Sequence, residues 1–385
     1  MTIYVNGRFL TQPTSGVQRF AREILTALDR ELCQSSVLRD RLGPIEVLVP
    51  QKVEAPGWRR LGLRHVPGGR GHLWEQGTLW RASRDGVLVS LGNSGPLLHR
   101  AHVLCLHDAN LWEIPQAYSA RYRLWHRALR PRLARRAAAL LTVSRHSATA
   151  LAAQLHLAED RFRIVANSAD HMLRLPSAPG VPARYGLTPG GYFLSVGNRS
   201  PNKNLRGLIA AHAACGSKVP PLVLVGGEVP GIATQATAGG GRIKMLGRVP
   251  DGDLRGLYEG ASAFVFAALH EGFGIPPLEA MQLGVPVICA RSGAMPEVLR
   301  DAPLWFDPKD DEDIARAMRA FAHLESGKRS AMVHSGQKQA QRYCWRESAR
   351  VLAQAVAGVP YQLPAGKQAV RGVFGSETRP AENLF

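Results

Sequence analysis

Short apolar segments alternate with stretches of helical periodicity along most of this chain of 385 residues. The apolar runs are the length of buried strands, while Phe20, Ile24 and Leu28 are spaced like one face of a helix. Such alternation is typical of parallel α/β layering. Two sets of six strands are predicted, at residues 3–5, 45–49, 87–89, 103–106, 140–143 and 164–165, and at residues 192–196, 222–225, 243–246, 263–266, 285–288 and 304–306.

Pro, Gly and Ala dominate residues 176–189, between the two sets of strands, and predict an interdomain linker. We therefore expect one Rossmann-like domain over residues 1–175 and a second over 190–345, each with a doubly wound sheet. Residues 346–357 have helical periodicity. From residue 358 to 385 the periodicity fades and Gly, Pro and charge dominate, which predicts a disordered tail.

Composition indicates an ordinary globular protein, because 45% of the residues are hydrophobic and 20% are charged. Runs without charge, such as 86–99 and 185–198 with 14 residues each, are shorter than a membrane span. No basic and apolar leader precedes the first strand, so we expect no secretory signal. The five cysteines are scattered and form no CxxC, which favours reduced thiols in a cytoplasmic protein.

The net charge of +18 lies mainly in the first half, where residues 1–180 hold 25 Arg and Lys against 13 Asp and Glu, a net of +12. Nucleic acid, anionic lipid or a phosphorylated substrate could each explain this excess. Biased genomic base composition is the alternative, since 40 of the 48 basic residues are Arg. A nucleic-acid partner is disfavoured because stacking aromatics do not alternate with the basic residues and no binding motif appears.

Residues 120–141 contain seven arginines, and Tyr122, Trp125, Leu129 and Leu133 share one face of the predicted helix. This segment could dock its apolar face on the sheet as a surface helix. It could also contact an anionic membrane that carries a lipid-linked acceptor. The two roles are compatible.

Residues 270–280, H-E-G-F-G-I-P-P-L-E-A, carry the clearest chemistry of the sequence. They follow the predicted strand 263–266, and Pro276 and Pro277 suit the first turn of a helix. The N–H groups of residues 272–274 and the helix dipole would converge on one point, which favours a phosphate. Glu271 and Glu279 lie on either side of that point, although a glutamate in a first helical turn is also favourable for the dipole alone.

This segment resembles the Glu-x7-Glu motif of the retaining family-4 glycosyltransferases (glycosyl transferases group 1), down to E-G-F-G-x-P-x-L-E-A. The resemblance covers residues 2–357 and is strongest in the second half. It implies the GT-B fold, an α/β architecture in which two Rossmann-like doubly wound domains face each other across a cleft. In such proteins the last helix, here 346–357, crosses back onto the N-terminal domain.

The resemblance also implies the reaction, in which a sugar moves with retention from a nucleotide diphosphate donor, GDP-mannose-like or a UDP-sugar, to a glycan or lipid-linked acceptor. It implies no cofactor and no metal ion. Bacterial surface polysaccharide, such as lipopolysaccharide, is the expected product, and the expected location is the cytoplasm, with peripheral attachment to the inner face of the membrane. A nucleotide-sugar 2-epimerase or a phosphorylase of the same fold is an alternative, but the first lacks this Glu-x7-Glu and lysine loop and the second needs a pyridoxal lysine.

A second constellation, G-N-R-S-P-N-K-N-L at residues 197–205, follows the predicted strand 192–196. Arg199 and Lys203 thus leave the carboxyl end of a strand, where ligands of open α/β sheets bind. Two cations there could hold a diphosphate and stabilise its charge as it departs, or they could be charges on a solvated turn. The loop resembles the family's V-G-x-x-x-P-x-K-N segment, but has Asn198 and Asn202 where many members have basic residues.

Two weaker signals lie in the first half. Ser15 and Gly16 open the first predicted helix, where they could approach a phosphate or simply cap the helix. His107 and Asp108 follow the strand 103–106, where the family carries a histidine. By resemblance, Gly16 would lie beside the donor diphosphate, and His107 would bind the transferred sugar or place the acceptor.

The resemblance assigns the remaining roles residue by residue. Glu271 would contact sugar hydroxyls, Glu279 the ribose, and the loop 247–249 the base. Asp251 and Asp253 predict the start of a helix, not a metal site. The expected catalytic residues are Glu271, Lys203, Arg199 and His107, and the expected substrate-binding residues are Gly16, Asn198, Val249, Gly272, Phe273, Gly274, Leu278 and Glu279.

Overall fold

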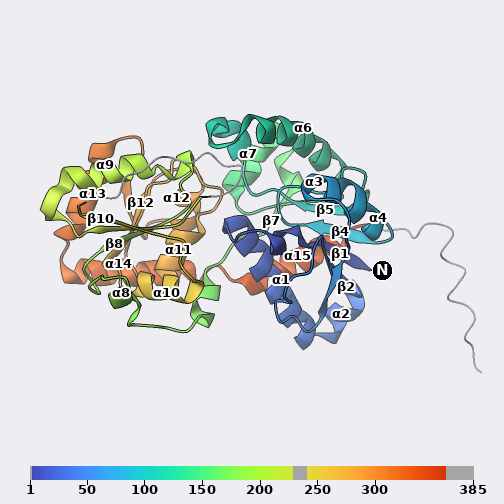
Figure 1. The fold of residues 1–385 in the computed structure, drawn as a ribbon, viewed down its shortest axis with the longest axis horizontal. Coiled ribbons are helices and arrows are strands. Elements are labelled where there is room, and N and C mark those ends of the chain that lie inside the picture. Colours follow the sequence, from blue (N-terminus) through green and yellow to red (C-terminus); the bar gives the residue numbers. More distant parts are fainter. Residues whose placement is uncertain (1, 229–240, 361–385) are drawn as a thin grey trace, which may run out of the picture.

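A computed structural model describes residues 2–228 and 241–360, which form two parallel sheets covered by helices (Figure 1). The first sheet has seven strands in the order β3-β2-β1-β4-β5-β6-β7. Its strands are β1 (Ile3–Asn6), β2 (Ile45–Val49), β3 (Leu61–His65), β4 (Val87–Ser90), β5 (His102–Cys105), β6 (Ala139–Thr142) and β7 (Phe162–Ile164). The strand order reverses between β1 and β4, which places ligands outside the carboxyl ends at that point.

The second sheet has six strands in the order β10-β9-β8-β11-β12-β13, and reverses between β8 and β11. Its strands are β8 (Phe193–Val196), β9 (Leu222–Val225), β10 (Ile243–Gly247), β11 (Ala263–Phe266), β12 (Val287–Ala290) and β13 (Leu304–Phe306). The predicted α/β fold class with two doubly wound sheets is confirmed. The prediction missed β3, and it placed β12 two residues too early.

Helices cover both faces of each sheet, so most strands are buried on two sides. The α-helices are α1 (Gly16–Gln34), α2 (Ser36–Leu42), α3 (Gly71–Leu73), α4 (Trp80–Ser83), α5 (Asn110–Glu113), α6 (Ala120–Arg136), α7 (Arg145–Leu155), α8 (Val181–Arg184), α9 (Leu205–Cys215), α10 (Asp251–Glu259), α11 (Ile275–Gln282), α12 (Met295–Leu299), α13 (Asp311–Ala322), α14 (Ser326–Ala340) and α15 (Trp345–Ala357). The 3-10 helices are η1 (Gly7–Thr11), η3 (Pro115–Ala117), η4 (Glu159–Arg161), η5 (Asp170–Arg174), η6 (Pro201–Lys203) and η7 (Gly216–Lys218), and η2 (Trp74–Leu79) is a π-helix.

The last helix, α15, lies beside α1 on the first sheet, although it follows the second sheet in the sequence (Figure 1). Glu31 of α1 accepts hydrogen bonds from Arg346 Nε at 2.6 Å and from Arg350 Nε at 2.9 Å. Leu352 and Val356 of α15 share a hydrophobic core with Leu25 and Leu28 of α1. The exact domain boundaries stay predictions, and residues 361–385 of the predicted tail lie outside the described residues.

Helix α6 docks one side on the first sheet, where Leu129 and Leu133 pack against Leu104 and Leu140. The expected apolar face is only partly buried, because Trp125 is 42% exposed. Every helix within residues 2–228 and 241–360 is too short or too polar to span a bilayer.

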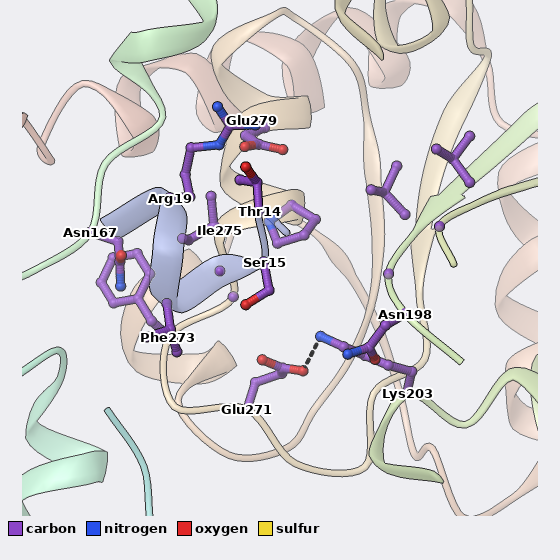
Figure 2. Close-up of a pocket in the computed structure, with 18 of the residues that line it drawn as sticks. Thr14, Ser15, Arg19, Asn167, Asn198, Lys203, Glu271, Phe273, Ile275 and Glu279 are labelled. Atoms are coloured by element: carbon purple, nitrogen blue, oxygen red, sulfur yellow. Dashed lines mark hydrogen bonds and ion pairs between the residues drawn. The ribbon is translucent and has the colours of Figure 1, made fainter. Parts of the chain in front are cut away.

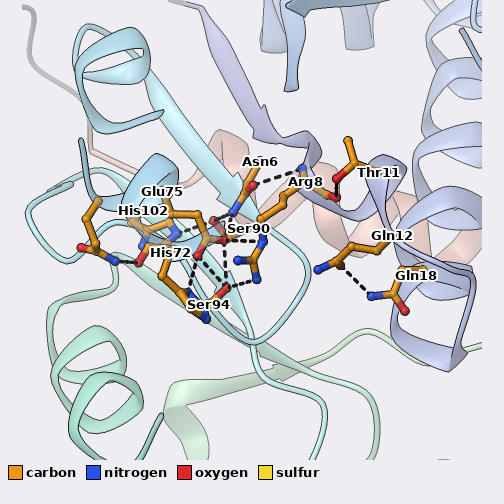
Figure 3. A network of polar contacts seen from close by, with 12 residues as sticks. Asn6, Arg8, Thr11, Gln12, Gln18, His72, Glu75, Ser90, Ser94 and His102 are labelled. Carbon is orange, nitrogen blue, oxygen red and sulfur yellow. Dashed lines mark hydrogen bonds and ion pairs between the residues drawn. The ribbon is translucent and has the colours of Figure 1, made fainter. Parts of the chain in front are cut away.

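A buried polar network joins the carboxyl ends of β1 and β4 (Figure 3). Glu75, at the centre, accepts hydrogen bonds from Asn6 Nδ2 at 2.8 Å and Ser94 Oγ at 2.9 Å, and pairs with Arg8 and His72. Burial alone would raise the pKa of Glu75, but the hydrogen bond with His72 and the charge of Arg8 hold it below its usual value. This satisfied network fixes η1 and η2 against the sheet.

Candidate active site

A cavity of about 450 Å³ lies between the two halves, at the carboxyl ends of both sheets (Figure 2). Residues within segments 14–19, 107–108, 143 and 167 line it from the first half, and residues within segments 196–203, 225–227, 248–254 and 271–279 line it from the second. Of the twelve predicted site residues, ten line this cavity: Gly16, His107, Asn198, Lys203, Val249, Glu271, Gly272, Phe273, Gly274 and Glu279. Arg199 and Leu278 are not among its lining residues.

The loop between β11 and α11 is shaped by two glycines. Gly274 caps α11 with φ at +84°, a left-handed conformation, and a side chain there would run into Met295. Gly272 approaches the first half so closely that an added Cβ would lie 2.6 Å from the carbonyl oxygen of His107. Gly272, Gly274 and Ile275 thus line the cavity together with His107 and Asp108 of the first half.

Hydrogen bonds from the start of α7 hold this loop against the first half. The carbonyl oxygen of Gly272 accepts from Ser144 Oγ at 2.6 Å and from Ser147 Oγ at 3.1 Å. Nearby, the carboxylate of Glu297 in α12 accepts the backbone N–H groups of Arg145 and His146 at 2.9 and 2.8 Å. The two halves are thus joined directly beside the predicted phosphate position.

Lys203 and Glu271 form an ion pair in the cavity, as Figure 2 shows. Both side chains are largely buried, and Asn202 Nδ2 donates a further hydrogen bond to Glu271 Oε1 at 3.2 Å. The predicted cation and the predicted sugar-binding carboxylate, from η6 and the loop before α11, therefore meet. Arg199 lies in the same loop as Lys203, and its buried Nε makes no hydrogen bond to any described residue.

Glu279 lies deeper, with 5% of the residue exposed. Its Oε2 accepts a hydrogen bond from the hydroxyl of Tyr258 at 2.9 Å, and its Oε1 lies 3.0 Å from His171 Nε2. Burial alone would raise the pKa of Glu279, but the hydrogen bond with His171, the nearby charge of Arg19 and the hydrogen bond from Tyr258 hold it below its usual value. The carboxylate therefore stays ionised at neutral pH and accepts hydrogen bonds only.

His107 is buried at the end of β5, edge-on to the ring of Phe20. Its Nε2 lies 2.8 Å from the carbonyl oxygen of Leu91, which can only accept. Burial lowers the pKa of His107, so the ring is neutral, with its proton on Nε2. Nδ1 is left as an acceptor, which suits a hydroxyl of a sugar.

Sequence reasoning missed several cavity residues, among them Arg19 and Asn167. Arg19 of α1 forms a bidentate ion pair with Asp251 of α10 at 2.7 and 2.6 Å, which joins the halves across the cavity. The Oδ1 of Asn167 is buried and accepts no hydrogen bond from the described residues. In the sequence, Arg19 was indicated only by the Ser-Gly entry into α1. Asp251 was expected to start α10, and it does lie in the first turn, but the N-cap residue is Pro250.

In the part of the chain that the structure describes, no three His, Cys, Asp or Glu side chains gather in a way that could hold a metal ion. Asp253 instead accepts hydrogen bonds from Tyr185 and Arg184. The positively charged side chains that line the cavity include Arg19, Lys203 and Arg248.

The sequence is similar to known glycosyltransferases. Residues 187–339 match the family model "Glycosyl transferases group 1". The chain is 34% identical to the O-antigen chain mannosyltransferase B of Escherichia coli over 260 residues, which cover 64% of this chain and 68% of that protein. It is 27% identical over 264 residues to the serotype-specific mannosyltransferase WbdA of Escherichia coli, covering 63% of this chain but only 31% of WbdA.

Solved structures show the same fold. The Anabaena protein Alr3699/HepE, solved in complex with UDP and glucose, superposes with a TM-score of 0.70 at 17% identity. The match covers 93% of this chain and 99% of that one.

Proposed function

Because this chain belongs to the glycosyl transferases group 1 family and is a glycosyltransferase, we propose that it transfers mannose from GDP-mannose, with retention, to a glycan or lipid-linked acceptor of a bacterial surface polysaccharide. Mannose is the first candidate because two proteins similar to this chain over more than 60% of its length are named mannosyltransferases. Other nucleotide sugars, UDP-sugars included, are the alternatives.

The observation that carries the proposal is the meeting of Lys203 and Glu271 beside the start of α11. Without ligand, the ammonium and the carboxylate satisfy each other. A sugar diphosphate offers a partner to both, since its phosphates attract Lys203 and its hydroxyls donate to Glu271. The N–H groups of residues 272–274 would hold a phosphate oxygen, as helix starts do.

The remaining residues would contact the two ends of the donor, the nucleoside and the sugar. Glu279 would accept from the ribose hydroxyls and Val249 would lie against the base, while His107 would accept from a hydroxyl of the transferred sugar. Lys203 would stabilise the charge of the departing diphosphate in place of a metal ion, with Arg199 adding to the positive field. Contacts of α7 and Arg19 with the second half would keep water out and favour transfer over hydrolysis.

A panel of nucleotide sugars tests the donor. GDP-mannose, UDP-glucose, UDP-galactose and UDP-N-acetylglucosamine would each be incubated with the protein, and release of the nucleotide would be followed with time. We expect slow release of GDP from GDP-mannose, because water can react with the donor in place of the missing acceptor. Preferred hydrolysis of a UDP-sugar would overturn the mannose assignment. If the protein neither bound nor hydrolysed any nucleotide sugar of the panel, the proposed function would be overturned.

Helix α6 has exposed side chains that could contact a membrane carrying a lipid-linked acceptor. Leu124 is 77% exposed, and Trp125 lies against His72 of α3, whose sequence neighbour Leu73 is 80% exposed. Exposed arginines surround these apolar groups, at positions 121, 127, 132, 135 and 136. Exposed apolar side chains among cations suit the surface of an anionic membrane, and we extend the proposal to peripheral attachment through this helix.

Vesicle binding tests that extension. Binding to vesicles that contain phosphatidylglycerol is expected to fall at least ~10-fold between 50 and 500 mM NaCl, because salt screens charges at the surface. Replacing Arg121, Arg127 and Arg132 by Gln should lower binding by a similar factor. The matched control replaces three exposed arginines of the second half, Arg206, Arg291 and Arg316, by Gln and should bind like the wild type. Equal binding to neutral vesicles would contradict the electrostatic attachment.

A further inference from the structure

Hydrogen bonds connect three buried side chains from distant parts of the sequence, and the last of the three lines the cavity. The indole N–H of Trp345, in α15, donates a hydrogen bond to Nδ1 of His171 at 3.3 Å. Nε2 of His171, in η5, lies 3.0 Å from Oε1 of Glu279 in α11. Trp345, His171 and Glu279 are 2%, 3% and 5% exposed, so water does not compete freely for these bonds.

The hydrogen-bond partners of His171 determine which of its two ring nitrogens carries a hydrogen. An indole N–H can only donate, so Nδ1 of His171 must accept. The carboxylate of Glu279 can only accept, so Nε2 must carry the proton. Both contacts are therefore satisfied by one neutral tautomer, and Trp345 selects the tautomer that Glu279 requires.

Glu279 is held from two sides and keeps capacity for a ligand. His171 binds one of its oxygens and Tyr258 the other, and each carboxylate oxygen has a second lone pair. The carboxylate lines the cavity near Arg19, as Figure 2 shows. A fixed, ionised carboxylate of this kind suits a pair of neighbouring hydroxyl groups.

The segment that carries His171 is fastened to α15. The backbone N–H of Trp345 donates to Oδ2 of Asp170 at 3.2 Å, and Ser168 Oγ donates to the carbonyl oxygen of Tyr343 at 2.9 Å. Ser348 Oγ donates to the carbonyl oxygen of Ala166 at 2.6 Å. The start of the last helix thus fixes the backbone from residue 166 to His171.

We propose that His171 is a positioning residue that holds Glu279 for the ribose hydroxyls of the nucleotide, and that Trp345 holds His171 in the required tautomer. The last helix is then part of the nucleotide site, although none of its residues lines the cavity. This inference rests on the proposed function, in which Glu279 binds the ribose. A purely structural role for the same contacts would affect folding without affecting how the ribose is recognised.

The test compares ribose with deoxyribose. Dissociation constants of GDP, UDP and their 2′-deoxy and 3′-deoxy counterparts would be measured by calorimetry, on the full chain. Wild-type protein should bind its preferred nucleotide at least ~10-fold more tightly than the deoxy forms, the scale of a hydrogen bond to a charged group. This ratio is taken on one preparation, so partial unfolding of a variant does not alter it.

Four variants separate the roles. Glu279→Gln and His171→Leu should both reduce the ratio of deoxynucleotide to nucleotide dissociation constants to about threefold or less. The reason is that losing a single hydrogen bond costs about tenfold in affinity, which removes most of the wild-type preference. His171→Gln keeps an N–H donor near the position of Nε2 and should restore most of the discrimination. Trp345→Phe removes the donor to Nδ1 and should give an intermediate ratio. The control is His212→Gln, because His212 is equally buried in α9 but does not line the cavity.

Each outcome decides one assignment. Wild-type discrimination by His171→Leu would overturn the positioning role and leave the proposed function intact. Wild-type discrimination by Trp345→Phe would remove Trp345 alone from the inference. Discrimination that is absent from the wild type, or retained by Glu279→Gln, would show that Glu279 does not bind the ribose and would overturn the inference, while activity measurements on Lys203 would still decide the proposed function.

Discussion

Lys203→Ala is expected to lower kcat at least ~100-fold, with a smaller change in KM, the scale for removing one group that stabilises developing charge. The ammonium of Lys203 lies in a partly buried cavity, where its field is weakly screened. The negative charge on the diphosphate grows as the bond to the sugar breaks, so the loss should fall mainly on the chemical step. Initial rates of nucleotide release from the preferred sugar donor measure it.

Three controls accompany this variant. Lys203→Arg keeps the charge in a different geometry and should retain part of the activity. Lys309→Ala removes an exposed lysine that does not line the cavity, and should leave kcat unchanged. EDTA should have no effect, since the proposal assigns no metal ion. Near wild-type turnover by Lys203→Ala would show that the leaving group is stabilised by other means.

Gly272→Ala is expected to lower kcat/KM by ~100-fold, the scale for a displacement of about 1 Å in an active site. The new methyl group would lie 2.6 Å from the carbonyl oxygen of His107 and 3.0 Å from Ser147 Oγ, so the loop and the first half must separate. That separation would weaken the hydrogen bonds from Ser144 and Ser147. It would also move the N–H groups of the loop away from the phosphate.

Gly327→Ala is the matched control, because a side chain at Gly327 in α14 meets nothing within 4 Å. It should change kcat/KM by less than about twofold, as exposed substitutions usually change little. Circular dichroism would establish that both variants are folded. Full activity of Gly272→Ala would mean that the halves do not need this close approach during transfer.

The fold could be predicted because apolar runs and helical periodicity report burial directly. The missed strand β3 (Leu61–His65) lies at the edge of the first sheet, where only Leu61 is buried, so its sequence lacks an apolar run. The two-residue error at β12 has a similar cause, since Val285 and Pro286 extend the apolar pattern before the ladder begins.

The candidate site was only partly predictable, because motifs reveal neighbours along the chain but not partners across it. His171 and Glu279 are 108 positions apart, and Arg19 and Asp251 are 232 apart, so no local pattern could pair them. The two predicted residues that do not line the cavity illustrate the same limit. Leu278 is fully buried in the core, and Arg199, just before the 3-10 helix η6, does not line the cavity.

The return of α15 to the first sheet has a consequence for how enzymes of this design could exchange parts. Helix α15 packs on the half that contains α1, so a cut at the linker alone would uncover Leu25 and Leu28 and would leave Glu31 without its arginine partners. A hybrid that takes its second half from another protein must therefore keep its own final helix. An exchange of the second half would therefore replace a segment inserted between α1 and α15, two helices that pack together.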